Sequence, residues 1–471
     1  MEKKVTVILI FASALLLQLF SLPPNDTLTY DGALYIDIAR SLTHGISNFT
    51  YQGIYMMYRP PLYPYTLSLF YHFIHEPLSQ LTVARLVSAV SFALTAVVTY
   101  LLAQGMFRSE VKALAAVGFF IFNPLAFTMG TRELVHSEFT FFYTLAVYLF
   151  YTGKKSGRGM RIYGAFISAG LAILTRYTGL SIIAVFLAYL WFTEDWRWIK
   201  RREYWIGFGI LLMTLLPWFY LGHVHYGGVF RPFSIASRVV TLDRPVSVSN
   251  YFHLLLKDMG RVLPAIAAIG FLRLKKDDEG WLLTSWLFIG LMGILTVTHK
   301  ETRFITFLAP AIALMAVEGV ELAVDAISEA LRRLGKESGV RKRTVLVAGI
   351  ALLVLIPVAS SAHSLHERWN MEGAAEATVL SRISAEHPAE SLLVSPGLYT
   401  MAGFYYPHAR VDMALDRKTV LQRVSEGYYG VIILKEPSNH LNIEESGRYV
   451  LTEEFYNGKF RIYLLKKNKE R

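Results

Sequence analysis

Long runs of apolar residues recur along most of the chain, and short polar connectors separate them. A run of about 18 or more apolar residues can cross the roughly 30 Å hydrocarbon layer of a membrane as a helix. Eleven segments follow this pattern, and we predict a membrane-spanning helix for each. The segments are residues 5–22, 80–104, 111–129, 134–152, 161–175, 177–193, 204–222, 259–272, 281–298, 303–325 and 344–362.

The polar connectors support this reading. Short loops rich in Lys and Arg stay in the cytoplasm. If the first helix leaves the cytoplasm behind Lys3 and Lys4, the alternation of eleven helices places every strongly basic connector on the cytoplasmic side. These connectors are residues 153–161, 194–203, 273–279 and 332–343. We therefore predict a cytoplasmic N-terminus and an extracytoplasmic C-terminal segment.

Composition points to the same class of protein. The chain is 54% hydrophobic and 18% charged, which is unusual for a soluble domain. The net charge of +11 lies mainly in the connectors, where it orients the chain and attracts anionic lipid. No nucleic-acid-binding motif accompanies it, so we expect no nucleic acid partner. The chain has no Cys, and an exported domain without disulfides indicates a prokaryotic cell membrane.

Two apolar segments depart from the spanning pattern. The first run has the length of a signal peptide, but residues 21–27 contain no small-x-small cleavage site, so we predict an anchoring helix. Residues 62–75 are short and interrupted by Pro64, which favours an interfacial or re-entrant segment.

The last hundred residues have a different pattern. A helix-like stretch at 372–387 precedes short apolar runs that are broken by Pro and Gly, and Asn457-Gly458 is typical of a tight hairpin. The predicted fold is a polytopic α-helical membrane domain, residues 1–365, followed by a small extracytoplasmic α/β domain, residues 366–471. The C-terminal domain either takes part in ligand binding or supports the membrane part.

Acidic residues stand out beside the first apolar run. Asp31 begins the stretch YDGALYIDIARSL, whose apolar residues, including Tyr35, recur at helical spacing. A carboxylate at a helix N-terminus is stabilised in its ionised form by the free N–H groups. Asp31 therefore either caps this helix or has a functional role, whereas Asp37 on the other face is expected to be solvated.

Basic residues and one further acid mark the predicted outer ends of other spans. Pro60 and Pro61 stiffen the backbone after Arg59, which suits a phosphate but also describes an interfacial arginine. Glu138 lies in the first turn of the span at 134–152, where a lipid-facing acid would be costly, so it is expected to face a protein cavity. Arg132 and Glu133 are expected at the interface. Further charges come from Arg176 and from the segment HKETRF, which contains His299, Lys300, Glu301 and Arg303.

The order of these motifs resembles a known family. YDGALYIDIARSL, RPPLYPYTL, HSEFTFFYTLAVYLF and LTRYTGL follow one another as in the GT-C glycosyltransferases of the protein O-mannosyltransferase and aminoarabinose lipid A transferase group. The resemblance covers roughly residues 5–325. HKETRF is also similar to a motif of lipid-linked-oligosaccharide mannosyltransferases. The chain departs from the group in having Gly32 after Asp31, Arg59 in place of Lys, and Glu138 in place of Asp.

The resemblance implies a membrane glycosyltransferase that takes a sugar, hexosyl or pentosyl, from a polyprenyl- or dolichyl-phosphate donor at the outer membrane face. The acceptor is a hydroxyl of a protein, a lipid or a glycan. No nucleotide-binding glycine pattern is present, in agreement with a lipid-linked donor. The family has both metal-dependent and metal-independent branches, so a divalent cation stays open, and no other cofactor is expected.

Site roles follow from this implied reaction. Asp31 is the predicted general base, and Glu138 orients the acceptor or assists Asp31. Arg59, Arg176, Lys300 and Arg303 are the predicted ligands of the donor phosphate. Tyr35, Tyr58, His299 and Glu301 are accessory candidates. The alternative is a transporter or flippase of a lipid-linked saccharide, although internal repeats and broken mid-membrane helices, typical of transporters, are not evident.

Overall fold

The computed structural model describes residues 3–24, 27–242, 245–334, 339–371, 374–413, 417–435, 448–456 and 461–467. The chain forms two compact units, which we describe separately. The first comprises Met1–Leu22, Met57–Tyr63 and Arg85–Trp369. The second comprises Pro23–Met56, Pro64–Ala84 and Asn370–Arg471.

All eleven segments predicted to span the membrane are helical over most of their length. They correspond to α1 (Lys3–Phe20), α4 (Pro77–Phe107), α5 (Glu110–Ile121), α7 (His136–Ser156), α8 (Gly159–Thr175), α9 (Ser181–Glu194), α10 (Arg202–Tyr226), α13 (Val262–Phe271), α14 (Asp278–Leu295), α15 (Ala309–Arg333) and α16 (Val340–Asn370). The predominance of such apolar helices identifies an integral membrane protein.

The span count of eleven is not established by these helices. Within the described part of the chain, six helical stretches are long and apolar enough to cross a membrane: Lys3–Phe20, Pro77–Phe107, Tyr177–Lys200, Arg202–Tyr226, Thr302–Arg333 and Val340–Asn370. The ten residues of α13 rise only about 15 Å, half the thickness of the hydrocarbon layer.

Shorter helices interrupt or connect the long ones. They are α3 (Leu62–Tyr71), α6 (Pro124–Met129), α11 (Arg231–Leu242), α12 (Val248–Asp258) and the 3₁₀ turns η1 (Tyr177–Leu180), η2 (Asp195–Lys200) and η3 (Thr302–Leu308). The predicted span 111–129 is two helices, because the Asn123 side chain accepts hydrogen bonds from the N–H groups of Leu125 and Ala126, both at 3.2 Å, and starts α6. The segment predicted at 62–75 is the short helix α3.

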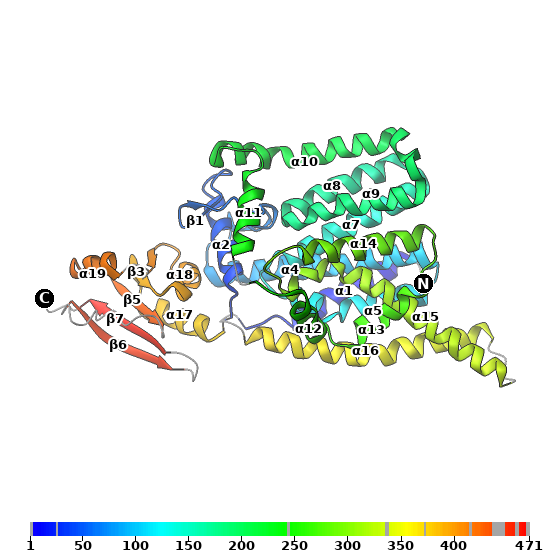
Figure 1. Ribbon diagram of the computed structural model, residues 1–471. Coiled ribbons are helices and arrows are strands. Elements are labelled where there is room, and N and C mark those ends of the chain that lie inside the picture. The colour runs from blue at the N-terminus through cyan, green and yellow to red at the C-terminus, as the bar shows by residue number, and fades with distance from the viewer. Residues whose placement is uncertain are drawn as a thin grey trace. The chain divides into compact units, whose positions relative to one another are not determined.

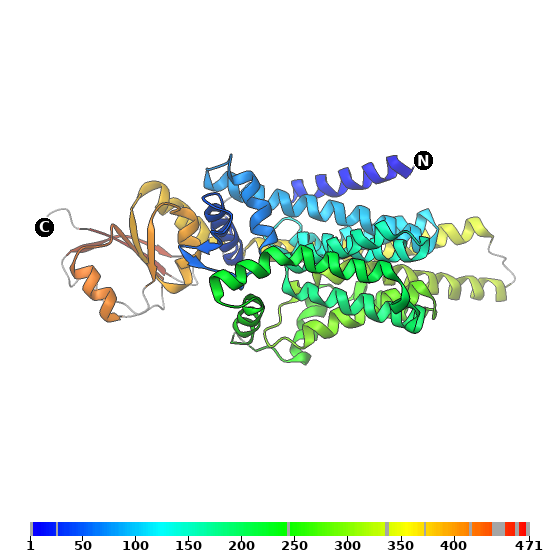
Figure 2. The same ribbon diagram turned by 90° about the horizontal axis from the view of Figure 1, so that it is seen from above.

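The helices of the first unit lie side by side. Helix α8 packs between α7 and α10, α9 packs on α14, and α15 packs on α5 and α13 (Figure 1). Helix α1 runs along the edge of this bundle (Figure 2). The closest approach joins α13 to α15, where a side chain on Gly270 would collide with the carbonyl oxygen of Met315, and one on Gly319 with that of Ile266. Small residues permit such close packing between membrane helices.

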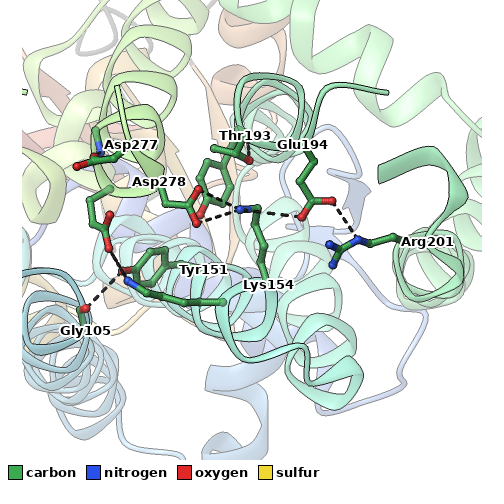
Figure 3. A network of polar contacts seen from close by, with 12 residues as sticks. Gly105, Tyr151, Lys154, Thr193, Glu194, Arg201, Asp277 and Asp278 are labelled. Carbon is green, nitrogen blue, oxygen red and sulfur yellow. Dashed lines mark hydrogen bonds and ion pairs between the residues drawn. The ribbon is translucent and has the colours of Figure 1, made fainter. Parts of the chain in front are cut away.

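Ion pairs join the basic connectors at one end of the bundle (Figure 3). The Lys154 ammonium group lies 3.0 Å from a carboxylate oxygen of Asp278 and 4.0 Å from a carboxylate oxygen of Glu194. Arg201 also pairs with the Glu194 carboxylate, at 3.1 Å. The connectors at 153–161, 194–203 and 273–279 therefore share one end of the first unit, as the alternation of spans requires. The membrane side that this end faces stays a prediction.

The C-terminal segment forms the predicted small α/β fold. Its sheet has the strand order β4-β3-β5-β7-β6, in which β3 is parallel to β4 and β5, and β7 is antiparallel to β5 and β6. The strands are β3 (Ser391–Val394), β4 (Arg410–Met413), β5 (Val431–Lys435), β6 (Tyr449–Tyr456) and β7 (Arg461–Lys467), and the helical elements are α17 (Ala374–Glu386), η4 (Pro396–Leu398), α18 (Tyr399–Tyr405) and α19 (Arg417–Ser425). The pairing of β6 with β7 confirms the predicted hairpin, whose Asn457-Gly458 turn lies outside the described residues.

The first loop packs with this α/β fold. It contributes α2 (Tyr30–Leu42), β1 (Thr50–Tyr51) and β2 (Ile54–Tyr55), and α2 lies against α18. The side chain of Thr29 caps α2 by accepting a hydrogen bond from the Gly32 N–H at 3.1 Å. The helix ends at Leu42.

We predict that Gly319→Ala lowers stability by about 1–3 kcal/mol, because the added methyl group forces the backbones of α13 and α15 apart. The matched control is Gly349→Ala on α16, where the added methyl group meets no atom within 4 Å. That change should raise stability by about 0.5–1 kcal/mol through helix propensity. Thermal unfolding of the purified protein in detergent measures both, and equal effects of the two substitutions would contradict the close packing.

Candidate active site

Four basic side chains surround the ring of Phe304 in η3. The guanidinium carbons of Arg176 and Arg303 lie 4.6 Å and 5.9 Å from its centre. The ring of His136 is stacked on it with centroids 6.2 Å apart, and the ring of His299 meets it edge-on at 6.1 Å. A cation held over an aromatic face is stabilised most where water is excluded. His136, Arg176, His299, Arg303 and Phe304 thus form one cluster of basic and aromatic side chains, which we call the Phe304 cluster.

Arg176 is placed by the abrupt end of α8. The residue is extended and separates α8 from η1, and η1 folds back so closely that a side chain on Gly179 would lie 2.9 Å from the Ala172 carbonyl group. The Arg176 guanidinium group lies 3.0 Å from Nδ1 and 3.2 Å from Nε2 of His136. Gly179 therefore allows the tight turn that directs Arg176 towards the beginning of α7.

The beginning of α7 carries Glu138. The Ser137 hydroxyl group donates to the Met129 carbonyl oxygen at 2.9 Å and fixes the first turn. Glu138 lies in this turn and is only 4% exposed. Its burial agrees with the expectation that the carboxyl group faces protein rather than lipid. His136 in the same turn belongs to the Phe304 cluster, so Glu138 lies within one helical turn of it.

The segment that carries Arg59 is held against η1 and α10. The Met57 N–H donates to the Tyr226 hydroxyl oxygen at 2.8 Å, and the Tyr177 hydroxyl group donates to the Met57 carbonyl oxygen at 3.0 Å. The Trp218 indole N–H donates to the Tyr177 oxygen at 2.8 Å. This chain of hydrogen bonds holds the backbone two residues before Arg59 against the residue that follows Arg176.

The side chain of Arg59 lies beside its neighbour Tyr58. The guanidinium carbon is 5.6 Å from the centre of the Tyr58 ring, and both residues are half-buried. Pro60 and Pro61 follow directly and restrict the backbone. The two predicted residues Arg59 and Arg176 therefore come from segments in direct contact.

The charged side chains of the segment HKETRF contact one another. Glu301 contacts both His299, at 2.9 Å, and Arg303. Lys300 is 7% exposed and donates to the Val246 carbonyl oxygen at 3.0 Å, which ties η3 to the loop before α12. One ammonium donor of Lys300 thus serves the backbone. The predicted phosphate-binding role of all these residues stays a prediction.

Asp31 and Tyr35 belong to the second unit. Asp31 lies half-buried in the first turn of α2, and Tyr35 is buried one turn later. Thr29 supplies the side-chain cap of α2, and Asp31 lies in the first turn, where a carboxylate also stabilises the helix N-terminus. The proximity of Asp31 to Glu138 and to the arginines of the first unit stays a prediction.

Asp37 is half-buried, whereas the sequence-based expectation was a solvated side chain. Its carboxylate accepts a hydrogen bond from the Gln52 N–H at 3.0 Å. Burial raises the pKa of Asp37 above its usual value, although this hydrogen bond and the nearby Arg40 act in the opposite direction. The residue faces the turn between β1 and β2 because that turn folds back over α2.

Several buried polar residues were missed by the sequence analysis. Arg85 and Glu133 are fully buried and form an ion pair at 3.0 Å, and Arg132 is also fully buried, so all three side chains are enclosed by protein. The predicted position of Arg132 and Glu133 at the depth of the membrane interface stays a prediction. Arg85 lies inside the apolar run 80–104, and an ionisable residue within a membrane span indicates a buried polar partner. This position could therefore have been recognised from the sequence. Tyr251 of α12 is fully buried, and its hydroxyl group has no hydrogen-bond partner among the described residues. No sequence pattern marked it.

An apolar cavity of about 400 Å³ opens beside η1. It lies between η1 and the start of α9 on one side and the C-terminal half of α14 on the other. The residues that line it include Tyr177, Thr178, Ser181, Phe288, Gly293 and Phe307. Because Tyr177 follows Arg176 directly, this cavity begins next to the Phe304 cluster. Over the described residues, no group of three His, Asp or Glu side chains is placed to share a metal ion.

Comparison with known proteins identifies the fold. Residues 58–221 match the family model described as dolichyl-phosphate-mannose-protein mannosyltransferase. The structure is similar to that of ArnT from Cupriavidus metallidurans bound to undecaprenyl phosphate, with 16% identity, 98% of each chain covered and a TM-score of 0.74. It is also similar to the archaeal oligosaccharyltransferase AglB from Archaeoglobus fulgidus in complex with an inhibitory peptide and a dolichol-phosphate, with 13% identity, 100% of this chain and 75% of that chain covered, and a TM-score of 0.58. No curated protein sequence matches the chain.

The raised pKa of Asp37 predicts a pH dependence of stability. At pH values above 3.8, the usual pKa of an aspartate, the folded protein binds more protons at Asp37 than the unfolded chain does. Ionisation of Asp37 therefore lowers the stability of the folded protein as the pH rises. Asp37→Asn retains an oxygen for the Gln52 N–H. It should therefore stabilise the protein more at pH 8 than at pH 5 in thermal unfolding. Asp195→Asn, at a side chain that is 78% exposed, is the control and should give no such trend. If Asp37→Asn changes the unfolding temperature equally at every pH, the pKa of Asp37 is not raised.

Proposed function

We propose that this chain, which has the GT-C fold of the protein O-mannosyltransferase and ArnT-like group, is a membrane glycosyltransferase. It transfers a hexosyl or pentosyl group from a polyprenyl- or dolichyl-phosphate donor to an acceptor hydroxyl group of a protein, a lipid or a glycan. The reaction takes place on the extracytoplasmic face of a prokaryotic cell membrane. The Phe304 cluster is the observation that carries this proposal, because it gathers two half-buried guanidinium groups around one aromatic ring.

The cluster and the adjoining cavity suit a lipid-linked phosphate. Arg176 and Arg303 present planar cations at the same aromatic ring, and guanidinium groups bind phosphate oxygens in pairs of parallel hydrogen bonds. The cavity beside η1 is mainly apolar and offers room for the first part of a polyprenyl chain. A phosphate next to an apolar groove is the arrangement that a lipid-phosphate donor requires.

The reaction is a direct displacement at the anomeric carbon. Asp31 removes the proton of the acceptor hydroxyl group as that oxygen bonds to the anomeric carbon. The bond between this carbon and the phosphate oxygen breaks, and the lipid phosphate leaves with the electron pair. Arg59, together with Arg176 or Arg303, stabilises the negative charge that grows on the departing phosphate. Glu138 orients the acceptor or assists Asp31.

Asp31→Asn should abolish sugar transfer, because an amide cannot accept the hydroxyl proton at neutral pH. The assay supplies radiolabelled polyprenyl-phosphate hexoses and pentoses to the purified protein in vesicles, with membrane extract from cells that lack the protein as acceptor. Asp37→Asn on the same helix makes the same chemical change and should retain transfer. Near-normal transfer by Asp31→Asn would remove Asp31 from the mechanism, and movement of intact labelled lipid without sugar release would indicate a flippase.

Arg176→Gln should lower kcat/KM for the donor by roughly 10- to 100-fold, the effect of removing a charge-assisted hydrogen bond worth about 1.5–3 kcal/mol. Arg201→Gln, which loses an ion pair at the opposite end of the first unit, is the matched control. It should leave kcat/KM per folded molecule unchanged. If the two variants have the same donor kinetics, Arg176 does not contact the donor.

A further inference from the structure

One arginine of α2 connects three segments of the second unit. The Arg40 Nε–H donates to the Gln80 side-chain oxygen at 2.6 Å, and an Nη1–H donates to the Phe404 carbonyl oxygen at 3.2 Å. Its guanidinium carbon also lies 4.9 Å from the centre of the Phe404 ring. Gln80 is itself held by a hydrogen bond from its amide to the Ile74 carbonyl oxygen at 2.8 Å. Arg40 therefore links α2 to the start of α4 and to α18 of the C-terminal fold.

The surroundings of Arg40 leave this side chain few alternatives. Burial lowers the pKa of Arg40, although arginine still remains charged at physiological pH. The guanidinium group is half-buried, and its Nε and Nη1 donors are paired, whereas Nη2 has no hydrogen-bond partner among the described residues. Loss of the two paired donors would be costly, because a polar group that leaves water needs a partner. Phe404 is fully buried and Gln80 is 3% exposed, so neither partner can follow a displaced helix freely. These contacts fix the position of α2 on α18.

A second set of contacts fixes the same two helices through the turn after β1. Gln52 has a φ of 47°, a left-handed conformation that is unusual for a residue with a side chain. The Gln52 backbone N–H donates to the Asp37 carboxylate of α2. The side-chain amide of Gln52 lies so close to Gly403 of α18 that a side chain at position 403 would collide with it. The Tyr51 ring also meets the Tyr399 ring edge-on at 5.9 Å. The C-terminal fold thus contacts both α2 and the turn between β1 and β2 that covers α2.

We propose that the C-terminal α/β fold holds α2, and with it Asp31, in the orientation needed for sugar transfer, and that Arg40 is the positioning residue of this clamp. The inference rests on the proposed function and assigns a role to the C-terminal domain. Asp31 is nine residues before Arg40 on the same helix, about 14 Å along its axis, so a small tilt at Arg40 displaces the carboxylate. A shift of about 1 Å in a reacting group can reduce the rate about 100-fold.

The kinetic test compares Arg40→Met with Arg40→Lys and with Arg410→Met. Arg40→Met removes the guanidinium group and should lower kcat by about 10- to 100-fold while the KM for the donor changes less than twofold, because the donor phosphate is bound by the first unit. Arg40→Lys keeps a charge beside Gln80 and should recover part of the rate. Arg410 lies in the same C-terminal fold with a side chain that is 60% exposed, and Arg410→Met should have no effect.

A spectroscopic test reads the position of α2 without any activity. The chain has no Cys, so Tyr30→Cys, at an exposed residue next to Asp31, can be labelled selectively with a nitroxide. Arg40→Met should increase the mobility of this label, and so should Tyr399→Ala, which removes the edge-on ring contact between α18 and Tyr51 and serves as an independent variant. Arg410→Met should leave the mobility unchanged.

The combined outcomes separate this inference from the proposed function. Increased label mobility together with reduced kcat supports the clamp. Unchanged mobility in both Arg40→Met and Tyr399→Ala overturns it, and so does increased mobility with normal sugar transfer. If the unmodified protein transfers no sugar from any donor in the panel, the proposed function fails. The mobility data then still decide whether the C-terminal fold holds α2.

Discussion

A charged side chain that leaves water must find a partner within the protein, and this constraint accounts for the arrangement of polar residues in the first unit. At one end, Lys154 lies between Asp278 and Glu194 and so connects the ends of α7, α9 and α14. Around Phe304, the half-buried arginines contact aromatic rings, His136 and Glu301. The same low dielectric that makes an isolated charge costly strengthens its interaction with a charged ligand.

The long helices were predictable because their formation depends on local hydrophobicity alone. A membrane satisfies apolar side chains on every face, so an apolar run is sufficient to predict a helix. The prediction failed where a local polar signal was overlooked: Asn123-Pro124 ends one helix and starts another inside the run 111–129. It also overestimated α13, whose ten residues pack against α15 through Gly270 and Gly319.

The candidate site was only partly predictable, because residue type can be read from the sequence but contacts between distant segments cannot. Arg176 and Arg303 were selected because each is a cation at the end of an apolar run. Nothing in that pattern indicated that both would approach Phe304, or that His136 would join them. Asp37 illustrates the opposite error. Helical spacing placed it on a polar face, but the turn at Gln52 covers that face in the folded protein.

The predicted base and the predicted phosphate ligands belong to different compact units, and this division separates two requirements of sugar transfer. Arg176 and Arg303 are positioned by α8, η1 and η3, all within the first unit. Asp31 is positioned by α2, which depends on Arg40 and α18 in the second. Changes in the C-terminal fold are therefore expected to act on proton removal from the acceptor, whereas changes around Phe304 act on the donor phosphate. A C-terminal fold with that role must pack tightly against α2, and the hydrogen bonds of Arg40 to Gln80 and Phe404 satisfy this requirement.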